Sequence, residues 1–324
     1  MKKILMMVLC GVMSFGVFAA DKEITFVTDW RAQAEHGGFY QALAKGYYAK
    51  RGLKVTIRPG GPQTDNPRLI AAGAIDIALA SNNFQPLNLI AAGAEVKVVM
   101  TTFQKDPQIL MVHPSVEANG FKDLKGMPIF LADSALATFW PWLQTKFGYE
   151  GRQIRKYTYS LAPWLVNKGT VQEGYLSSEP YSAEQAGVKP KVFLFADEGY
   201  LGYAGMVMVR SQFLDKNSAV VQAFVDASLE GWKDYIWGDP AAGNALILKD
   251  NPEMTEDLIA FAIAAMKRHE MLGSKAMVGT MTENRWRDFH REMSALDLLP
   301  ENLDVGAAFT LEFLRKSVAS RAAK

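Results

Sequence analysis

Strand-like and helix-like segments alternate along this chain from residue 23 onward, and this alternation limits the fold more than any other feature. Alternating or apolar strand patterns cover residues 23–28, 53–58 and 75–80, and helical periodicity covers 38–51 and 66–72 between them. A strand–helix–strand order predicts a parallel sheet with right-handed connections. A second cycle of strands and helices begins after His113-Pro114. The sequence therefore predicts an α/β protein.

The two cycles predict two lobes. The chain enters the second cycle near residues 110–114 and returns near 201–207, after which almost every pattern is helical. We expect each lobe to be a mixed sheet flanked by helices, with a helical C-terminal region. The predicted first lobe is 20–110 with 207–324, and the second is 111–206. Two crossings form a hinge, and the cleft beside a hinge is a ligand site. One continuous sheet with a site at its switch point remains the alternative.

The first 19 residues have the pattern of a secretory signal peptide. Lys2 and Lys3 precede an apolar run over residues 4–17 that is too short to span a bilayer, and small residues follow it. Cleavage there removes Cys10, the one cysteine of the 324-residue chain. A cysteine-free mature protein suits an oxidising compartment, so we expect a periplasmic protein. A buried N-terminal helix is the alternative.

Composition and motifs exclude several classes of function. Lys and Arg number 35 against 34 Asp and Glu, a net charge of +1, which disfavours a nucleic-acid partner. The four histidines form no HExxH or HxxxH pair, and no GxSxG motif is present. We therefore expect a binding protein with no catalytic residue, no metal and no cofactor.

Polar and aromatic residues follow the predicted strands of the first lobe. Ligands bind beyond the carboxyl ends of parallel strands, an aromatic ring there stacks on a flat ligand, and glycines at a helix start admit close backbone approach. Hydroxyl and amide groups suit a neutral ligand. The predicted ligand residues are Asp29, Trp30, His36, Gly37, Gly38, Pro59, Gly60, Ser81, Asn82 and Asn83. Core packing, turns and helix caps are the alternative roles.

Aromatic residues are also concentrated in the predicted second lobe. Tyrosine and tryptophan at loop ends favour a planar aromatic ligand over a sugar or an inorganic ion, so we expect an aromatic, uncharged cleft. One carboxylate after a strand could accept hydrogen bonds from a ring amine. The predicted ligand residues of this lobe are Thr138, Trp140, Tyr175, Glu179 and Tyr181.

Several blocks of this sequence resemble the NMT1/THI5-like family of periplasmic substrate-binding proteins of ABC importers. The resemblance implies a two-lobed type II binding fold that closes on a small aromatic heterocycle. It implies delivery to permease and ATPase subunits in the inner membrane, with the chain acting as a monomer. Relatives bind pyrimidine precursors of thiamine, and some bind riboflavin. The matching blocks are Thr28-Asp29-Trp30, His36-Gly37-Gly38-Phe39-Tyr40, Ala44-Lys45-Gly46-Tyr47-Tyr48, Arg51-Gly52-Leu53, 69–78, Asp123-Leu124-Lys125-Gly126, 174–181 and 213–217.

Three alternatives to a pyrimidine binder stay open. One is a riboflavin binder, and another is a pyrimidine (HMP phosphate) synthase on the same fold. By resemblance the synthase's lysine and histidine fall at Ala80 and Phe84, and its cysteine-rich stretch falls near 199–203, where this chain has no cysteine. The third is a binder of sulfonates or other anions, for which Arg31 and Arg58 are the first-lobe candidates.

Overall fold

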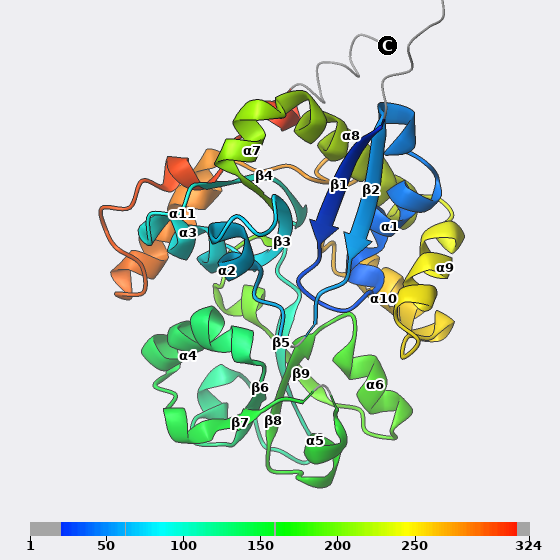
Figure 1. Ribbon diagram of the computed structural model, residues 1–324. Helices are drawn as coiled ribbons and strands as arrows, with labels where there is room; N and C mark the ends of the chain where they lie inside the picture. Colours follow the sequence, from blue (N-terminus) through cyan, green and yellow to red (C-terminus); the bar gives the residue numbers. More distant parts are fainter. Residues whose placement is uncertain (1–20, 62, 159, 316–324) are drawn as a thin grey trace, which may run out of the picture.

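The computed structural model describes residues 21–61, 63–158 and 160–315 and shows two α/β lobes, one above the other (Figure 1). Each lobe is built around a five-stranded sheet. The predicted signal peptide over residues 1–19, with Lys2, Lys3 and Cys10, lies outside the described residues. In the described part of the chain, no helix is long and apolar enough to cross a membrane.

The first sheet has the strand order β2-β1-β3-β10-β4. Strand β1 pairs in parallel with β2 and β3, whereas β10 pairs antiparallel with β3 and β4. The sheet is therefore mixed rather than wholly parallel, because β10 returns from the second lobe and is inserted between two strands of the first. The strands are β1 (Lys22–Val27), β2 (Leu53–Arg58), β3 (Ile77–Asn82), β4 (Val96–Phe103) and β10 (Ala204–Arg210).

The second sheet repeats this arrangement with the order β7-β6-β8-β5-β9. Strand β6 pairs in parallel with β7 and β8, and β5 pairs antiparallel with β8 and β9. Each lobe thus contains one antiparallel strand next to a crossing. The strands are β5 (Gln108–Val112), β6 (Ile129–Leu131), β7 (Ile154–Lys156), β8 (Val171–Tyr175) and β9 (Lys191–Leu194).

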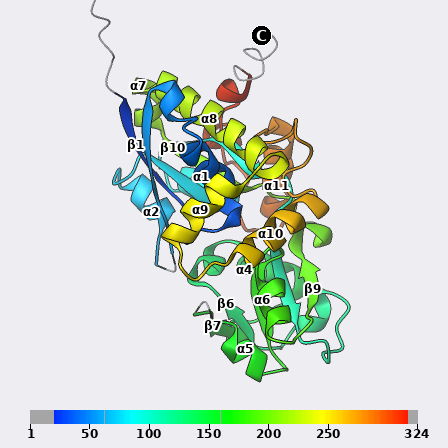
Figure 2. The ribbon, with the colours of Figure 1, turned by 90° about the vertical axis from the view of Figure 1, so that its right-hand side faces the viewer.

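Helices flank both sheets, and most of those after β10 belong to the first lobe (Figure 2). The first-lobe helices are α1 (Gly37–Ala44), α2 (Asn66–Ala71), α3 (Phe84–Ala91), α7 (Ser211–Lys216), α8 (Ser218–Trp237), α9 (Ala241–Asp250), α10 (Glu256–Arg268) and α11 (Glu283–Ala295). The second-lobe helices are α4 (Phe139–Phe147), α5 (Ala162–Val166) and α6 (Glu179–Gln185). Short 3₁₀ helices are η1 (Ala34–His36), η2 (Ala49–Arg51), η3 (Phe121–Leu124), η4 (Asp133–Ala137), η5 (Gly151–Gln153), η6 (Phe195–Glu198) and η7 (Val305–Ala308).

Glycines allow α1 to pack against α8 at very short range. A Cβ atom at Gly38 would lie 2.1 Å from the Trp232 ring, and one at Gly37 would lie 2.0 Å from the Tyr235 ring. A Cβ at Gly231 on α8 would lie 2.2 Å from the carbonyl oxygen of Gly38. Such distances leave no room for any side chain. The two glycines that open α1 therefore serve helix packing inside the first lobe.

Two short segments connect the lobes. The first crossing is residues 104–107, between β4 and β5, and the second crossing is residues 199–203, between η6 and β10. The boundaries expected at 110/111 and 206/207 fall inside β5 and β10, which are single unbroken strands. The first crossing thus precedes the expected range of 110–114, and the second overlaps the expected range of 201–207.

Candidate ligand-binding cleft

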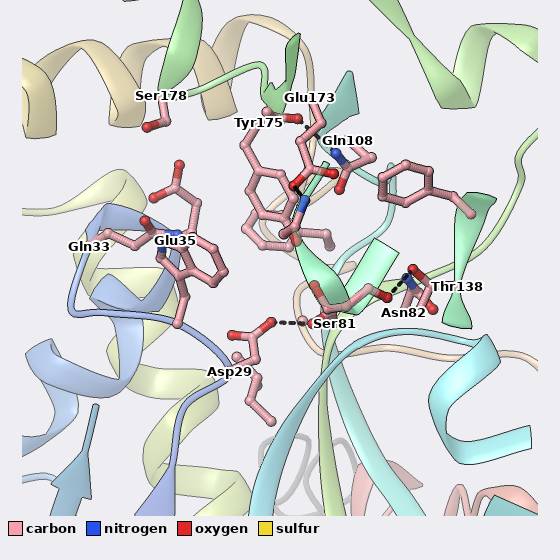
Figure 3. A pocket seen from close by; sticks show the side chains of 18 of the residues that line it. Asp29, Gln33, Glu35, Ser81, Asn82, Gln108, Thr138, Glu173, Tyr175 and Ser178 are labelled. Atoms are coloured by element: carbon pink, nitrogen blue, oxygen red, sulfur yellow. Dashed lines mark hydrogen bonds between the residues drawn. The ribbon is translucent and has the colours of Figure 1, made fainter. Parts of the chain in front are cut away.

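One cavity lies between the lobes and is lined by residues of both. It contains about 820 Å³ of empty space, part of it open to solvent, which suits a small organic ligand. The first lobe contributes the loop after β1, the helix η1 and the end of β3. The second contributes the end of β8, the start of α6 and η4. Figure 3 shows that the labelled side chains of both walls face the same space.

The first-lobe wall is organised around Asp29. Its Oδ2 accepts a hydrogen bond of 2.7 Å from the Ser81 hydroxyl, and its Oδ1 lies 3.1 Å from Nε2 of His36. His36 is 2% exposed, and its Nδ1 has no hydrogen-bond partner among the described residues. The ring of Trp30 lines the cavity beside this group. This wall therefore combines an indole face with a fixed carboxylate.

The second-lobe wall is organised around Glu179 and Glu173. The Glu179 carboxyl accepts hydrogen bonds from the Tyr175 backbone N–H at 2.7 Å and from the Tyr157 hydroxyl at 3.2 Å. Glu173 Oε1 accepts the backbone N–H of Ala132 at 2.6 Å. These contacts fix both carboxyls against the cavity.

The two walls also touch each other directly. The Ser177 hydroxyl, between β8 and α6, donates a hydrogen bond to Glu35 on η1. Glu35 is 3% exposed and Ser177 is fully buried. Close by, α10 lies against α6, and the ring centroids of Phe261 and Tyr181 are 5.0 Å apart (Figure 2). The lobes are thus joined by a buried polar bond and an aromatic contact in addition to the crossings.

Four carboxyl groups line the cavity: Asp29, Glu35, Glu173 and Glu179. Among the residues that the structure describes, no lysine or arginine lines it. Burial raises the pKa of Glu173 to about 8 and that of Glu179 to about 7, and it also raises the pKa of Glu35. Two of the four carboxyls, those of Glu35 and Glu173, were not predicted from the sequence, so the lining holds more carboxyl groups than expected. Their raised pKa favours the protonated, uncharged form, so they do not contradict the expectation of an uncharged lining.

The structure brings eight of the predicted ligand residues to this cavity. They are Asp29, Trp30, His36, Ser81, Asn82, Thr138, Tyr175 and Glu179. Trp30, His36 and Glu179 in particular line the same space although they come from different lobes. Their role in binding stays a prediction.

The other predicted ligand residues lie elsewhere. Gly37 and Gly38 pack against α8. Asn83 is fully buried and accepts the Tyr203 N–H at 2.5 Å, and Trp140 is 4% exposed and packs near Tyr149. These four residues therefore support the structure around the cleft instead of lining it.

Three further predicted residues lie outside the lining but near it. Gly60 donates its N–H to the Thr28 hydroxyl and to the Trp30 carbonyl, both at 3.0 Å, so it positions the loop that carries Asp29 and Trp30. Pro59 lines a separate surface groove with Arg58. Tyr181 contacts Phe261 across the lobes. None of the three lines the main cavity.

Several lining residues were not predicted from the sequence. They are Gln33, Glu35, Leu79, Gln85, Phe103, Gln108, Ala132, Ser134, Phe139, Tyr157, Glu173, Gly174, Ser178 and Gly205. Glu173 and Gln108 lie on β8 and β5, which pair with each other in the second sheet. The sequence signal that could have identified them is a polar residue at the start of the otherwise apolar β5 and an adjacent Gln172-Glu173 pair within β8.

The buried carboxyls predict how stability depends on pH. Glu173 and Glu179 keep their protons in the folded state up to about pH 8 and about pH 7, but lose them above their ordinary value of 4.5 when unfolded. Unfolding then releases protons, so the free energy of unfolding falls as the pH rises through this window. We expect a loss of roughly 1 to 3 kcal/mol between about pH 5 and about pH 8, measured by urea denaturation.

Glu173→Gln should flatten this slope, because the isosteric amide does not titrate. Glu184→Gln, at an exposed position on α6, should keep the original slope. Equal slopes in both variants would contradict the assignment of the pH dependence to Glu173.

Comparisons with known proteins agree with this geometry. A family model described as NMT1/THI5 like matches residues 33–242. The riboflavin-binding protein RibY of Chloroflexus aurantiacus is 25% identical over 304 residues, which cover 90% of this chain and 86% of that protein. The formylaminopyrimidine-binding protein of Halalkalibacterium halodurans is 24% identical over 234 residues, 69% of each chain.

Solved structures show the same fold at lower sequence identity. The periplasmic aliphatic sulphonate-binding protein SsuA of Escherichia coli superposes with a TM-score of 0.65 at 16% identity, covering 88% of this chain and 96% of that one. The two-lobed α/β fold of periplasmic binding proteins, with two mixed sheets flanked by helices, is therefore confirmed. At this level of identity the likeness concerns the fold alone.

Proposed function

Because this chain belongs to the NMT1/THI5-like family, we propose that it is the solute-binding component of an ABC importer and captures a small aromatic heterocycle between its lobes. The observation that carries the proposal is the interlobe cavity, lined by aromatic rings and carboxyls from both lobes. A shared cavity of this kind suits capture by closure of two lobes. Its lining suits a flat ligand with hydrogen-bond donors.

An aminopyrimidine of thiamine metabolism is the ligand class that this lining fits best. Trp30 and Tyr175 offer ring faces from opposite walls. Glu179 and Asp29 offer acceptor oxygens for an exocyclic amine, and a carboxyl with a raised pKa offers a proton to a ring nitrogen. The similarity to a formylaminopyrimidine-binding protein supports the same class.

Riboflavin is the second candidate, supported by the similarity to RibY over 90% of this chain. Its isoalloxazine ring is also flat and carries ring nitrogens and carbonyls. The ribityl chain would need the part of the cavity that is open to solvent. The two candidates differ in size and in donor pattern, so direct binding separates them.

The anion alternative is disfavoured by charge. Among the described residues no lysine or arginine lines the cavity, so an anion there would have no compensating cation, and any lining carboxyl that is ionised would repel it. Arg31 instead forms an ion pair with Glu253, and Arg58 lines a different groove. The cleft therefore lacks the features that a sulfonate site requires.

The synthase alternative is disfavoured by side-chain chemistry. Ala80 is fully buried in β3, and Phe84 packs against Phe289 with ring centroids 5.3 Å apart. Neither can act as the lysine or histidine of the enzyme, and residues 199–203 contain no cysteine. We propose a non-catalytic periplasmic monomer that carries its ligand to permease and ATPase subunits.

Isothermal titration with three probes tests the proposal. We expect formylaminopyrimidine or riboflavin to bind with a Kd near or below about 1 μM, and the sulfonate MOPS not to bind. Binding of MOPS alone would favour the anion alternative. A flat response to all three probes would remove both named ligands.

A further inference from the structure

The two crossings between the lobes meet at a single side chain, that of Arg285. This residue lies in the first turn of α11 and is half-buried. Its Nη2 donates hydrogen bonds to the carbonyl of Gln104 in the first crossing and to that of Gly202 in the second, the latter at 2.9 Å. Its Nε donates to the carbonyl of Leu201 at 3.1 Å. One guanidinium therefore joins both connections between the lobes.

Further contacts hold Arg285 in this orientation. Its guanidinium carbon lies 4.1 Å from the centroid of the Tyr203 ring, a stacked cation–π arrangement. The Tyr203 hydroxyl accepts the backbone N–H of Thr282, just before α11, at 3.0 Å. The planar guanidinium carries several N–H donors in fixed directions and can bind both crossings at once, whereas a lysine ammonium is a single point charge.

Helix α11 itself is anchored in the first lobe. Phe289 packs on Phe84 of α3, and Trp286 stacks on Phe309 with ring centroids 5.1 Å apart. The segment before α11 holds the first crossing as well, because the Met271 carbonyl accepts the N–H groups of Gln104 at 2.7 Å and of Lys105 at 3.0 Å. In each crossing, the end that joins the first lobe is therefore attached to that lobe by hydrogen bonds.

We propose that Arg285 is a positioning residue for lobe closure: it fixes both crossings to the first lobe, so the second lobe rotates about residues 105–107 and 199–200. Rotation of the backbone at Gln104, Leu201 or Gly202 would break hydrogen bonds to the guanidinium. Gly199 has φ of +89°, a conformation that glycine adopts without strain, and it lies on the expected moving side.

This inference rests on the proposed function in one respect, namely that the lobes move. Interlobe distances in the ligand-free protein test it without reference to any ligand. Spin labels on Lys249→Cys of α9 and Glu184→Cys of α6, both exposed positions, report the opening of the cleft. The one native cysteine, Cys10, lies in the predicted signal peptide; in protein that retains this segment, Cys10→Ser keeps the labelling specific.

We expect Arg285→Lys to broaden the distance distribution by about twofold, because a single ammonium cannot hold both crossings. The matched control is Arg287→Lys on the same helix, whose exposed guanidinium binds only Glu283 in the structure as described. Thermal unfolding of each variant shows that it is folded. A folded Arg285→Lys protein with the wild-type distribution would overturn the proposal.

A second variant keeps the proposal falsifiable if the Arg285 variant does not fold. Lys105 of the first crossing pairs with Asp197 of η6 at 2.8 Å, an independent link on the moving side. Lys105→Gln should leave the distribution unchanged, because Arg285 still holds both crossings. Broadening in Lys105→Gln would show that the ion pair, and not Arg285, controls the hinge.

A wild-type distance distribution that has one maximum and does not change when formylaminopyrimidine or riboflavin binds would count against lobe motion.

Discussion

Replacing Gly38 by alanine is expected to lower the free energy of unfolding by about 3 kcal/mol or more. The added methyl group would lie 2.1 Å from the Trp232 ring and 2.6 Å from the Trp232 Cα, so α1 would have to move away from α8. Because the Trp232 Cα is a backbone atom, no rotation of a side chain can relieve this contact. Urea denaturation monitored by circular dichroism measures the change.

Gly61→Ala is the matched control, because a Cβ atom there meets nothing within 4 Å. Its unfolding free energy should change little. If Gly38→Ala were as stable as the control and instead lost ligand affinity, the glycine would belong to the binding site, as the sequence pattern indicated.

Replacing Trp30 by alanine is expected to weaken ligand binding by about 100-fold, which corresponds to about 3 kcal/mol. The indole face lines the interlobe cavity, and its removal takes away the largest aromatic surface of the first-lobe wall. Titration calorimetry with whichever of formylaminopyrimidine or riboflavin binds the wild-type protein measures the loss. Calorimetry is preferable to fluorescence because the substitution removes a reporter tryptophan.

Trp237→Ala provides the control for a general effect of losing a tryptophan. Trp237 ends α8, is 38% exposed and does not line the cavity. Its variant should bind as the wild type does. Equal affinities in Trp30→Ala and the wild type would show that the ligand does not contact this ring.

The sequence patterns predicted local structure better than long-range pairing. The helical pattern expected after the second crossing is present in the structure, where the longest helix is α8 over Ser218–Trp237. By contrast, the periodicity of residues along a strand does not show which other strands pair with it. The antiparallel insertion of β10 between β3 and β4 therefore could not be predicted from residues 204–210.

The glycine pair at the start of α1 shows why the site was predicted only in part. Gly37 and Gly38 indicated a close approach, and the structure contains one, but to Tyr235 and Trp232, almost two hundred residues later. Adjacent glycines indicate a close approach of other atoms, but they do not show whether those atoms belong to a ligand or to the protein itself. Asp29 and Trp30 follow the carboxyl end of a parallel strand and line the cavity, whereas their role in binding stays a prediction.

The acidic character of the cleft required tertiary structure. Glu35 and Glu173 are far apart in sequence, and each alone is an ordinary charged residue. Each is buried only in the folded chain, Glu35 against Ser177 and Glu173 against Ala132, and this burial raises the pKa of both. Burial of charged groups is a property of the assembled lobes, which local pattern analysis does not capture.

The hydrogen bond from Ser177 to Glu35 bears on the lobe motion proposed above. If the lobes move, a bond between them favours a sealed population of molecules over an accessible one. Only the accessible fraction admits a solute, so the observed dissociation constant equals the intrinsic one divided by that fraction. A variant that removes this bond, such as Ser177→Ala, should therefore enlarge the accessible fraction and lower the observed dissociation constant.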